Sequence, residues 1–158
     1  MTESARRAGH DDVNALAALA TAALDEQRAA RGGELLARRD SRPRPAHEWL
    51  RVGLADPDEL VLVGTWDDAV VGYAVASIET LRDGGRLAVL AELYVEPEAR
   101  GVAVGEALMD TVLAWATERG CFGIDATVLP GNRESKNFFE RYGLKARAIR
   151  VHRRLEPQ

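Results

Sequence analysis

The stretch Glu92–Gly105, which reads ELYVEPEARGVAVG, decides how this sequence folds. Its first half has the alternation of a β-strand, which predicts that Leu90, Glu92 and Tyr94 point to one face and the residues between them to the other. Pro97 ends the strand, because proline has no N–H to donate to a neighbouring strand. The chain is therefore expected to enter a loop at this point.

The second half of the stretch, Arg100–Gly105, is a loop of small residues that leads directly into a strongly helical run. Backbone N–H groups at the start of a helix converge on one point, and the helix dipole adds positive potential there. Successive N–H groups arranged in this way bind anions. The sequence therefore predicts an anion site here, most simply for a phosphate.

Composition narrows the class of protein. With 158 residues, 46% hydrophobic and 29% charged, the chain is expected to form a single globular domain over residues 1–158. The formal net charge of −4 argues against bulk nucleic-acid binding. Cys121 is the only cysteine, so no intramolecular disulfide can form, and the scattered histidines make no metal-ligand spacing. The apolar run from Val13 to Leu24 is too short to cross a bilayer. We expect a cytoplasmic protein with no metal site that binds neither nucleic acid nor membrane.

The first half of the chain alternates helical and extended segments. Asp11 or Asp12 is expected to cap a first helix that runs to about Ala30. Residues 34–45 are polar and basic and contain two prolines, which predicts a loop, either a solvated connector or a substrate-side loop that changes shape on binding. The other segments expected here are a short edge strand at 3–8, a helix at 45–55, and strands at 60–66 and 70–78 joined by the turn Asp67-Asp68.

The second half of the chain contains a strand–helix–strand unit. A strand at 86–95, a helix at 103–119 and a strand at 122–129 follow one another, so the two strands are expected to be parallel. A helix at 133–142 and a last strand or hairpin arm at 144–155 follow. The expected architecture is α/β, with a mixed, mostly antiparallel sheet and about four helices.

The order of these elements and two motifs resemble the GNAT superfamily of N-acetyltransferases over nearly the whole chain. The acetyl-CoA signature of that family, an arginine or glutamine followed by spaced small residues, is matched by Arg100–Gly105, and Leu93–Pro97 before it is also similar to the family. The residues of a second family motif are present as Asn132, Ser135, Phe138, Phe139, Gly143 and Leu144.

The resemblance implies the GNAT fold, with acetyl-CoA as cosubstrate. It implies that the cofactor is bound by Leu93, Tyr94, Val95, Arg100, Gly101, Val102, Ala103, Val104, Gly105, Asn132, Ser135 and Phe139. Arg100 and the loop amides are expected to hold the pyrophosphate, and the N–H of Val95 or a neighbour to polarise the thioester carbonyl. Asn132 can equally be read as a helix cap, and both roles are compatible.

Two residues depart from the family pattern. Ala103 stands where the family usually has a glycine, which places a methyl group near the phosphates and is expected to weaken cofactor binding without abolishing it. Phe139 stands where many members carry the tyrosine that protonates the leaving thiolate. The proton would then come from Tyr142, from Tyr94 or from solvent, whereas the ordinary reading of Tyr142 is a packed aromatic at a helix end.

Acetyl transfer also requires an uncharged amine. At pH 7 an alkyl amine with a pKa near 10.4 is neutral in about one molecule in 2,500, and an α-amine with a pKa near 8 in about one in 10. An alkyl amine therefore gains much more from a base. Glu92 is the candidate, directly or through water, because the resemblance places its strand beside the thioester. The alternative is a carboxylate that faces solvent or pairs with an arginine.

The predicted function is therefore an acetyl-CoA-dependent N-acetyltransferase, in which a primary amine of a small molecule or peptide attacks the thioester directly. Ala103 and Phe139 leave two other readings open: a catalytically weak module that binds acyl-CoA as a sensor or partner subunit, and a transferase that uses another acyl group. An acidic acceptor would be attracted by Arg38, Arg39, Arg42 and Arg44. Members of the family often dimerise, and a homodimer is compatible with the resemblance.

Overall fold

The computed structural model describes residues 2–155. Within them the chain forms five strands, β1 (Glu3–Arg7), β2 (Glu59–Trp66), β3 (Ala69–Thr80), β4 (Arg86–Val95) and β5 (Gly123–Ala126). It forms five α-helices, α1 (Val13–Arg28), α2 (Gly33–Leu35), α3 (His47–Ala55), α4 (Val104–Glu118) and α5 (Arg133–Arg141). Shorter helical turns lie at His10–Asp12, Leu36–Asp40 and Pro97–Ala99.

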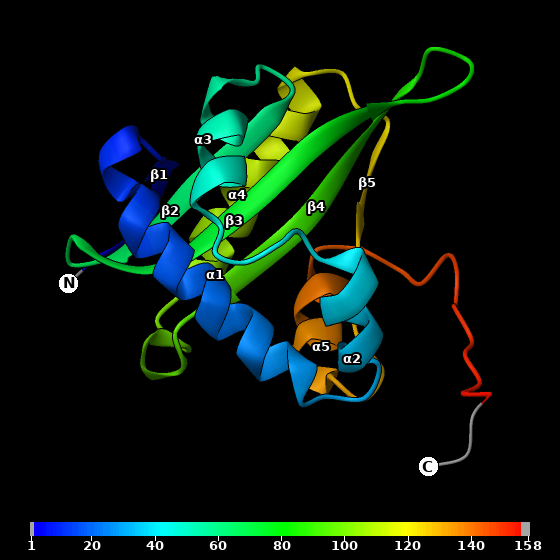
Figure 1. Cartoon of the computed structure of the whole chain (residues 1–158). Coiled ribbons are helices and arrows are strands. Elements are labelled where there is room, and N and C mark those ends of the chain that lie inside the picture. The colour runs from blue at the N-terminus through cyan, green and yellow to red at the C-terminus, as the bar shows by residue number, and fades with distance from the viewer. Residues whose placement is uncertain (1, 156–158) are drawn as a thin grey trace.

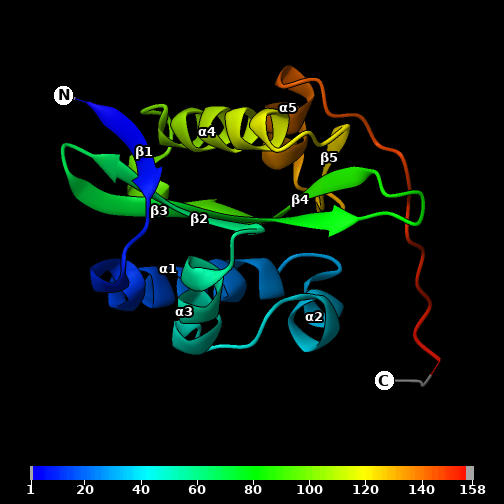
Figure 2. The same ribbon diagram turned by 90° about the horizontal axis from the view of Figure 1, so that it is seen from above.

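The elements are arranged in three layers. Figure 1 shows the sheet running through the middle of the molecule, and Figure 2 shows it edge-on, with α4 and α5 on one face and α1, α2 and α3 on the other. Each helix layer covers a separate apolar core. This is the α/β architecture that the sequence predicted.

The strands follow the order β1-β2-β3-β4-β5. The first four are antiparallel to their neighbours, whereas β4 and β5 are parallel. Helix α4 makes the crossover between β4 and β5. The expected strand–helix–strand unit and the mixed, mostly antiparallel sheet are both confirmed.

Helix α4 packs closely against the sheet. Val104, Leu108 and Val112 repeat at intervals of four residues and are buried on one side of the helix. Val104 and Leu108 face β2 at Gly64, where an added Cβ would lie 2.7 Å from the Cγ1 atom of Val104. The absence of a side chain in β2 therefore sets the position at which α4 begins.

The turn between β2 and β3 has the backbone that a two-residue hairpin requires. Asp67 and Asp68 have φ values of 47° and 67°, and positive φ at both central residues is the pattern of a type I′ turn. Aspartate tolerates this region better than most residues. Thr2 fastens the turn, because its C=O accepts from the N–H of Asp67 at 2.8 Å. The predicted hairpin is confirmed without a glycine in the turn.

The prediction of a loop over residues 34–45 is wrong for its first part, which is helical from Gly33 to Asp40. Tertiary contact explains the difference. An added Cβ on Gly33 would lie only 1.9 Å from the carbonyl oxygen of Gln27, so this glycine lets the segment fold back against the last turn of α1. The ion pair between Glu34 and Arg38 then spans one helical turn.

The prediction of a last strand at 144–155 is also wrong, because no strand is formed there among the described residues. Apart from a bond between the Leu144 N–H and the Phe139 C=O at the end of α5, no backbone hydrogen bond joins this segment to another described residue. Strand propensity is local, but a ladder needs a neighbour, and this segment has none within residues 2–155.

The start of α1 differs in detail from the expectation. Asp12 caps the short turn that precedes the helix, because its carboxylate accepts from the N–H of Gly9 at 2.8 Å. The same carboxylate pairs with Arg6, and hydrogen bonds from that guanidinium hold the pKa of Asp12 below its ordinary value. No hydrogen bond from the Asp12 side chain to the first turn of α1 is present.

Candidate functional site

Strand β4 carries a bulge that decides which of its side chains share a face. Val75 of β3 pairs with Glu92, but the next residue of β3 pairs with Leu90, so Ala91 has no partner. A bulge of this kind shifts the alternation by one residue. Leu90 therefore belongs to the core under α4, whereas Tyr94 packs against the core under α1 and α3. The prediction that Leu90 shares a face with Glu92 and Tyr94 is wrong.

The far end of β4 has one edge without a partner strand. β4 and β5 are paired only along Leu87–Leu90, and β5 ends before it can cover the rest of β4. On the other edge the N–H of Glu96 donates to the carbonyl of Val71 at 2.8 Å. Because bonding alternates along an antiparallel pair, the N–H groups of Leu93 and Val95 point away from β3, to the side that β5 has left.

The loop after β4 leads directly into a helix, as the sequence predicted. Gly101 and Ala103 have φ values of 91° and 66°, and α4 begins at Val104. The first hydrogen bond of the helix runs from Ala107 to the carbonyl of Ala103 at 3.0 Å. Among the described residues no acceptor is recorded for the N–H groups of Gly101, Val102, Ala103, Val104 and Gly105. The loop therefore offers backbone donors at a helix N-terminus, which is the chemistry of an anion site.

We expect Ala103→Gly to stabilise the protein. A left-handed backbone costs a non-glycine residue about 1–2 kcal/mol, and the extra freedom of glycine in the unfolded chain offsets about half of the gain. Urea unfolding should therefore show a rise of about 0.5–1 kcal/mol in the free energy of unfolding. Gly101→Ala is the matched control, because Gly101 is also left-handed and a Cβ there would touch nothing within 4 Å, so it should lower the free energy. Equal stability of Ala103→Gly and the wild type would contradict a strained backbone at Ala103.

Arg100 is tied to two other elements. Its Nε donates to the carbonyl of Val95 at 2.8 Å, which fastens the loop to the end of β4. Its Nη2 contacts both carboxylate oxygens of Glu26 on α1, at 2.9 and 3.0 Å. The guanidinium also lies over the ring of Tyr94, 5.4 Å from the centroid. The arginine predicted to bind a phosphate is thus paired with a carboxylate of the same chain, and the sequence offered no signal for Glu26.

Glu92 lies in a nearly buried ion pair. Arg44 donates Nη2 to Oε1 at 2.7 Å and Nη1 to Oε2 at 3.1 Å, and the side chains are 10% and 15% exposed for Arg44 and Glu92. The hydroxyl of Tyr73 donates to Oε1 at 2.5 Å. Burial, followed by the charge of Glu92, raises the pKa of Tyr73 far above its ordinary value, so this hydroxyl stays protonated. A carboxylate accepts about four hydrogen bonds, so one acceptor position of Oε2 is left.

The arginines of residues 38–44 are all engaged. Each pairs with a carboxylate of this chain: Arg38 with Glu34, Arg39 with Asp40, Arg42 with Glu59 and Arg44 with Glu92. Arg42 and Arg44 also lie over the ring of Trp49, at 5.2 and 5.5 Å from its centroid. Their charges are neutralised within the chain, so they give little support to an acidic acceptor.

The second motif lies at the start of α5. Asn132 caps that helix, because its side-chain oxygen accepts from the N–H of Ser135 at 3.1 Å. Phe138 and Phe139 are half-buried against the α4 core and meet edge to face, with centroids 5.4 Å apart. Gly105 lies against the Phe138 ring, because a Cβ added to this glycine would lie 3.6 Å from the Cε1 atom of Phe138. The motif therefore joins α5 to the N-terminus of α4, which brings the two predicted parts of the site together.

Tyr142, at the end of α5, packs against α4. Its ring lies 5.2 Å from that of Phe138, and its hydroxyl donates to the carbonyl of Glu106 at 3.4 Å. The pKa of Tyr142 is raised, first by burial and then by the carboxylates of Asp110 and Glu106. Tyr94 also has a raised pKa, from burial and then from the charge of Glu26. Both phenols are therefore protonated at neutral pH, and the hydroxyl of Tyr142 points toward the first turn of α4.

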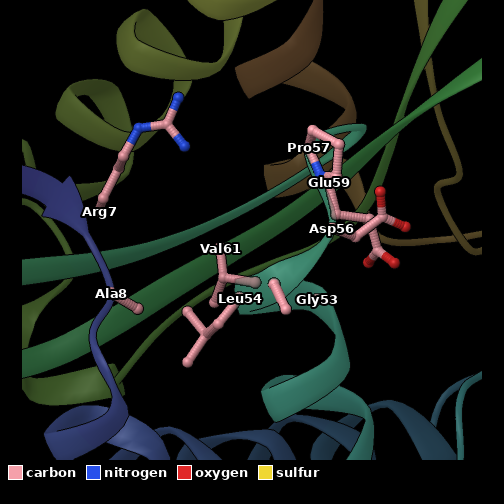
Figure 3. Close-up of a pocket in the computed structure, with 9 residues that line it drawn as sticks. Arg7, Ala8, Gly53, Leu54, Asp56, Pro57, Glu59 and Val61 are labelled. Carbon is pink, nitrogen blue, oxygen red and sulfur yellow. The ribbon is translucent and has the colours of Figure 1, made fainter.

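A pocket of about 220 Å³ lies elsewhere, and Figure 3 shows its lining. It is formed by the ends of β1 and α3 and the start of β2, including Arg7, Gly53 and Glu59. Glu59 is aligned across the sheet with Ser77 and Val89, and so lies toward the other end of the sheet from the loop after β4. In Figure 3 the Arg7 guanidinium points away from the Glu59 carboxylate. We assign the pocket no part in the site.

Comparison with known protein families identifies the family of this chain. The family model described as Acetyltransferase (GNAT) family matches residues 18–144, which include β4, the loop and the whole of α5. The chain belongs to the GNAT acetyltransferase family. A curated relative, the thialysine N-epsilon-acetyltransferase of Bos taurus, is 30% identical over 74 residues, which are 47% of this chain and 44% of that protein. The chain thus matches less than half the length of this relative.

Several solved structures share the fold over nearly the whole chain. The BH1408 protein of Bacillus halodurans, as a tetramutant, has a TM-score of 0.80 at 17% identity, covering 96% of this chain and 99% of that one. AAC(6')-Iy in complex with a bisubstrate analogue of CoA has a TM-score of 0.74 at 18% identity, covering 99% and 100%. Glucosamine-6-phosphate N-acetyltransferase from Arabidopsis thaliana has a TM-score of 0.67 at 18% identity, also covering 99% and 100%. At these identities the likeness establishes the fold, and the GNAT fold predicted from the sequence is confirmed.

Within residues 2–155 no helix is long and apolar enough to cross a membrane. The same part of the chain holds no group of three or more histidine, cysteine, aspartate or glutamate side chains placed to bind a metal ion.

Proposed function

We propose that this acetyltransferase moves an acetyl group from acetyl-CoA to a primary amine of a small molecule or peptide, by direct attack of the amine on the thioester. One observation carries the proposal: the backbone donors of residues 101–105 adjoin the edge of β4 that β5 leaves without a partner. A single cofactor with a pyrophosphate at one end and an extended amide-containing arm at the other fits both features.

In this proposal each part of the site has its own task. The loop amides hold the pyrophosphate, with Arg100 beside them, and the backbone of Leu93–Val95 pairs with the pantetheine arm. The N–H of Val95 polarises the thioester carbonyl, since it points to the edge without a partner. Asn132, Ser135 and Phe139, from the start and the middle of α5, complete the cofactor site in this proposal, and Phe139 packs against the core that α4 covers.

The proton steps are assigned as follows. Glu92 receives the proton of the amine through the remaining acceptor position of Oε2, directly or through water. Tyr142 is the proposed donor to the departing thiolate, because its hydroxyl lies at the first turn of α4. The departing thiolate, whose parent thiol has a pKa near 8.5, can also take a proton from solvent, so we expect Tyr142→Phe to retain more activity than a change at Glu92.

The acceptor is proposed only as a class. The names of similar proteins point to amines of small molecules: the bovine relative is a thialysine acetyltransferase, and two structural neighbours are AAC(6')-Iy and a glucosamine-6-phosphate acetyltransferase. A cytoplasmic location stays a prediction of the sequence.

A thiol-release assay with a panel of amines and several acyl-CoA donors tests the function. We expect turnover of acetyl-CoA with at least one small primary amine. Calorimetric binding of acetyl-CoA without turnover on any amine would instead support the acyl-CoA-binding module, to which Ala103 and Phe139 point. Faster turnover with a longer acyl-CoA would support a transferase that uses another acyl group.

We expect Glu26→Gln to tighten the binding of CoA. Glu26 competes with the pyrophosphate for Arg100 and adds a negative charge beside it. The pair is partly exposed, so the gain should be modest, about threefold to fivefold in Kd by calorimetry at low salt and less at high salt.

Asp25→Asn is the matched control for this change. It removes the same charge from the neighbouring position of α1, and no ion pair of Asp25 is recorded among the described residues. A similar gain in both variants would mean that net charge, rather than release of Arg100, is the cause. Unchanged affinity in Glu26→Gln would remove Arg100 from the pyrophosphate site.

Ala103→Gly, which removes the methyl group from the loop, should tighten CoA binding or leave it unchanged.

A further inference from the structure

Strand β5 carries a second carboxylate on the sheet face that carries Glu92. On β3, Val75 and Ser77 point to the same face, because successive side chains of a strand alternate. Val75 is paired with Glu92. Ser77 is aligned with Val89 of β4, and Val89 is aligned with Asp125 of β5. Asp125 therefore shares the face of Glu92, whereas the residues on either side of it in β5 face the core under α4.

Asp125 lies beside the place where β4 and β5 separate. The pairing of the two strands ends at Leu90 and Ala126, the residue directly after Asp125. The side chain of Asp125 is 26% exposed, and Figure 1 shows no helix of the described chain in front of the paired parts of β4 and β5. The proposed thioester site begins at the same place, so an acceptor that approaches it over this face meets two carboxylates.

The two carboxylates have a spacing that suits a short alkyl chain. Val89, which lies beside Asp125, and Glu92 are three residues apart on β4, and one residue between them is the bulge at Ala91. With about 3.3 Å per residue and about 4.8 Å between strands, the Cα atoms of Asp125 and Glu92 lie roughly 8–11 Å apart. Two amino groups at hydrogen-bond distance from the carboxylates, joined by about four or five carbons, span this separation.

Asp125 is bound in this structure by a guanidinium that another cation can displace. Arg147 Nε contacts both carboxylate oxygens, at 2.9 and 3.0 Å, and its Nη2 donates to Oδ2. The Arg147 side chain is 70% exposed, and among the described residues only Asp125 accepts from it. Its segment, residues 145–155, has no backbone hydrogen bond to the rest of the described chain. Arg44, by contrast, is also fastened by two backbone carbonyls. Because exposed ion pairs contribute little, a cationic substrate competes effectively with Arg147.

We propose that Asp125 binds a second ammonium group of the acceptor, so that the preferred acceptor is an alkyl diamine. This inference rests on the proposed function, because it assigns the far end of the amine whose near end meets Glu92. The ammonium donates to the Asp125 carboxylate in place of Arg147, and the alkyl chain lies along β4 over the half-buried side chain of Val89. Asp125 thus determines specificity and takes no part in moving the acetyl group.

Steady-state kinetics with cadaverine and pentylamine test the proposal, because these amines have the same carbon chain and differ only in the second amino group. We expect kcat/KM of the wild type to be about 10-fold higher for cadaverine, and the preference to shrink as salt is added. Equal values, apart from the factor of about two that a second reactive amine gives by number, overturn the inference and leave the proposed function standing. Turnover of other amines but of neither of these does the same. Turnover of no amine overturns both.

Two variants that break the same ion pair separate substrate binding from a structural role. Asp125→Asn removes the carboxylate and should lower kcat/KM for cadaverine about 10-fold more than for pentylamine, mainly through KM. Arg147→Gln removes the competing guanidinium and should lower KM for cadaverine about twofold to threefold. If the pair only holds residues 145–155 in place, both variants shift both amines in the same direction, and that result overturns the inference. Thermal unfolding verifies that the two variants are folded.

Discussion

Glu92→Gln is expected to slow the acetylation of alkyl amines about 100-fold while slowing that of α-amines less than about 10-fold, because general-base catalysis contributes most where the neutral amine is rarest. The carboxylate is placed for this work by Arg44 and Tyr73, which take three of its acceptor positions and leave one on Oε2. A glutamine at this position has no comparable basicity. The measurement is kcat/KM for both kinds of amine with the same enzyme preparation at pH 7.

The ratio of kcat/KM between the two amine classes distinguishes loss of a base from partial unfolding of the variant. A variant that is partly unfolded loses rate equally with both amines, so only a selective loss reports a base. Glu79→Gln, at an exposed position of β3, is the matched control and should leave both rates unchanged. If the two amines slow equally in Glu92→Gln, the carboxylate has a positioning role through Arg44, and the proton leaves by another route.

Arg44→Met is expected to lower the free energy of unfolding by about 3 kcal/mol, because it leaves a nearly buried carboxylate with only the Tyr73 hydroxyl as partner. The same change removes the bond from Arg44 Nε to the carbonyl of Ala20, which ties residues 42–45 to α1. The expected loss is at the lower end of the range for buried pairs, because the two side chains are 10% and 15% exposed. Urea unfolding measures it.

Two further variants show whether the buried charge is responsible. Arg42→Met breaks a more exposed pair, with Glu59 at 3.0 Å, and should cost about 1 kcal/mol or less. Adding Glu92→Leu to Arg44→Met removes the stranded carboxylate and should recover more than about 1 kcal/mol. A loss in Arg44→Met no larger than in Arg42→Met would contradict the assignment of Glu92 as a buried charge that depends on Arg44.

Much of the fold could be predicted because its signals are local. The strand that ends at Pro97, the small residues that follow and the helical period after Val104 lie within one short stretch, and all three are found. The parallel pairing of β4 and β5 followed from the strand–helix–strand order of the predicted elements. The helical segment at 33–40 was missed, because it depends on the fit of Gly33 against α1 and not on the composition of residues 34–45.

The parts of the site that were missed come from distant positions. Arg44 and Glu92 are 48 residues apart, and Glu26 and Arg100 are 74 residues apart. No local pattern specifies such partners, because several arginines and carboxylates of similar spacing are present. The bulge at Ala91 was equally hidden, since residues 87–91 are all apolar and have no polar–apolar alternation that an extra residue would interrupt.

The sequence by itself determined the loop of free backbone donors at the start of α4, because an N-terminal helix turn exposes its N–H groups whatever packs around it. It also determined the family, through motifs on consecutive elements. Only the tertiary structure decided that Ala103 adopts a left-handed backbone, that Glu26 holds Arg100 and that Arg44 holds Glu92. The physical reason is that backbone donors are set by local conformation, whereas the charge state and freedom of a side chain depend on which partners the fold brings to it.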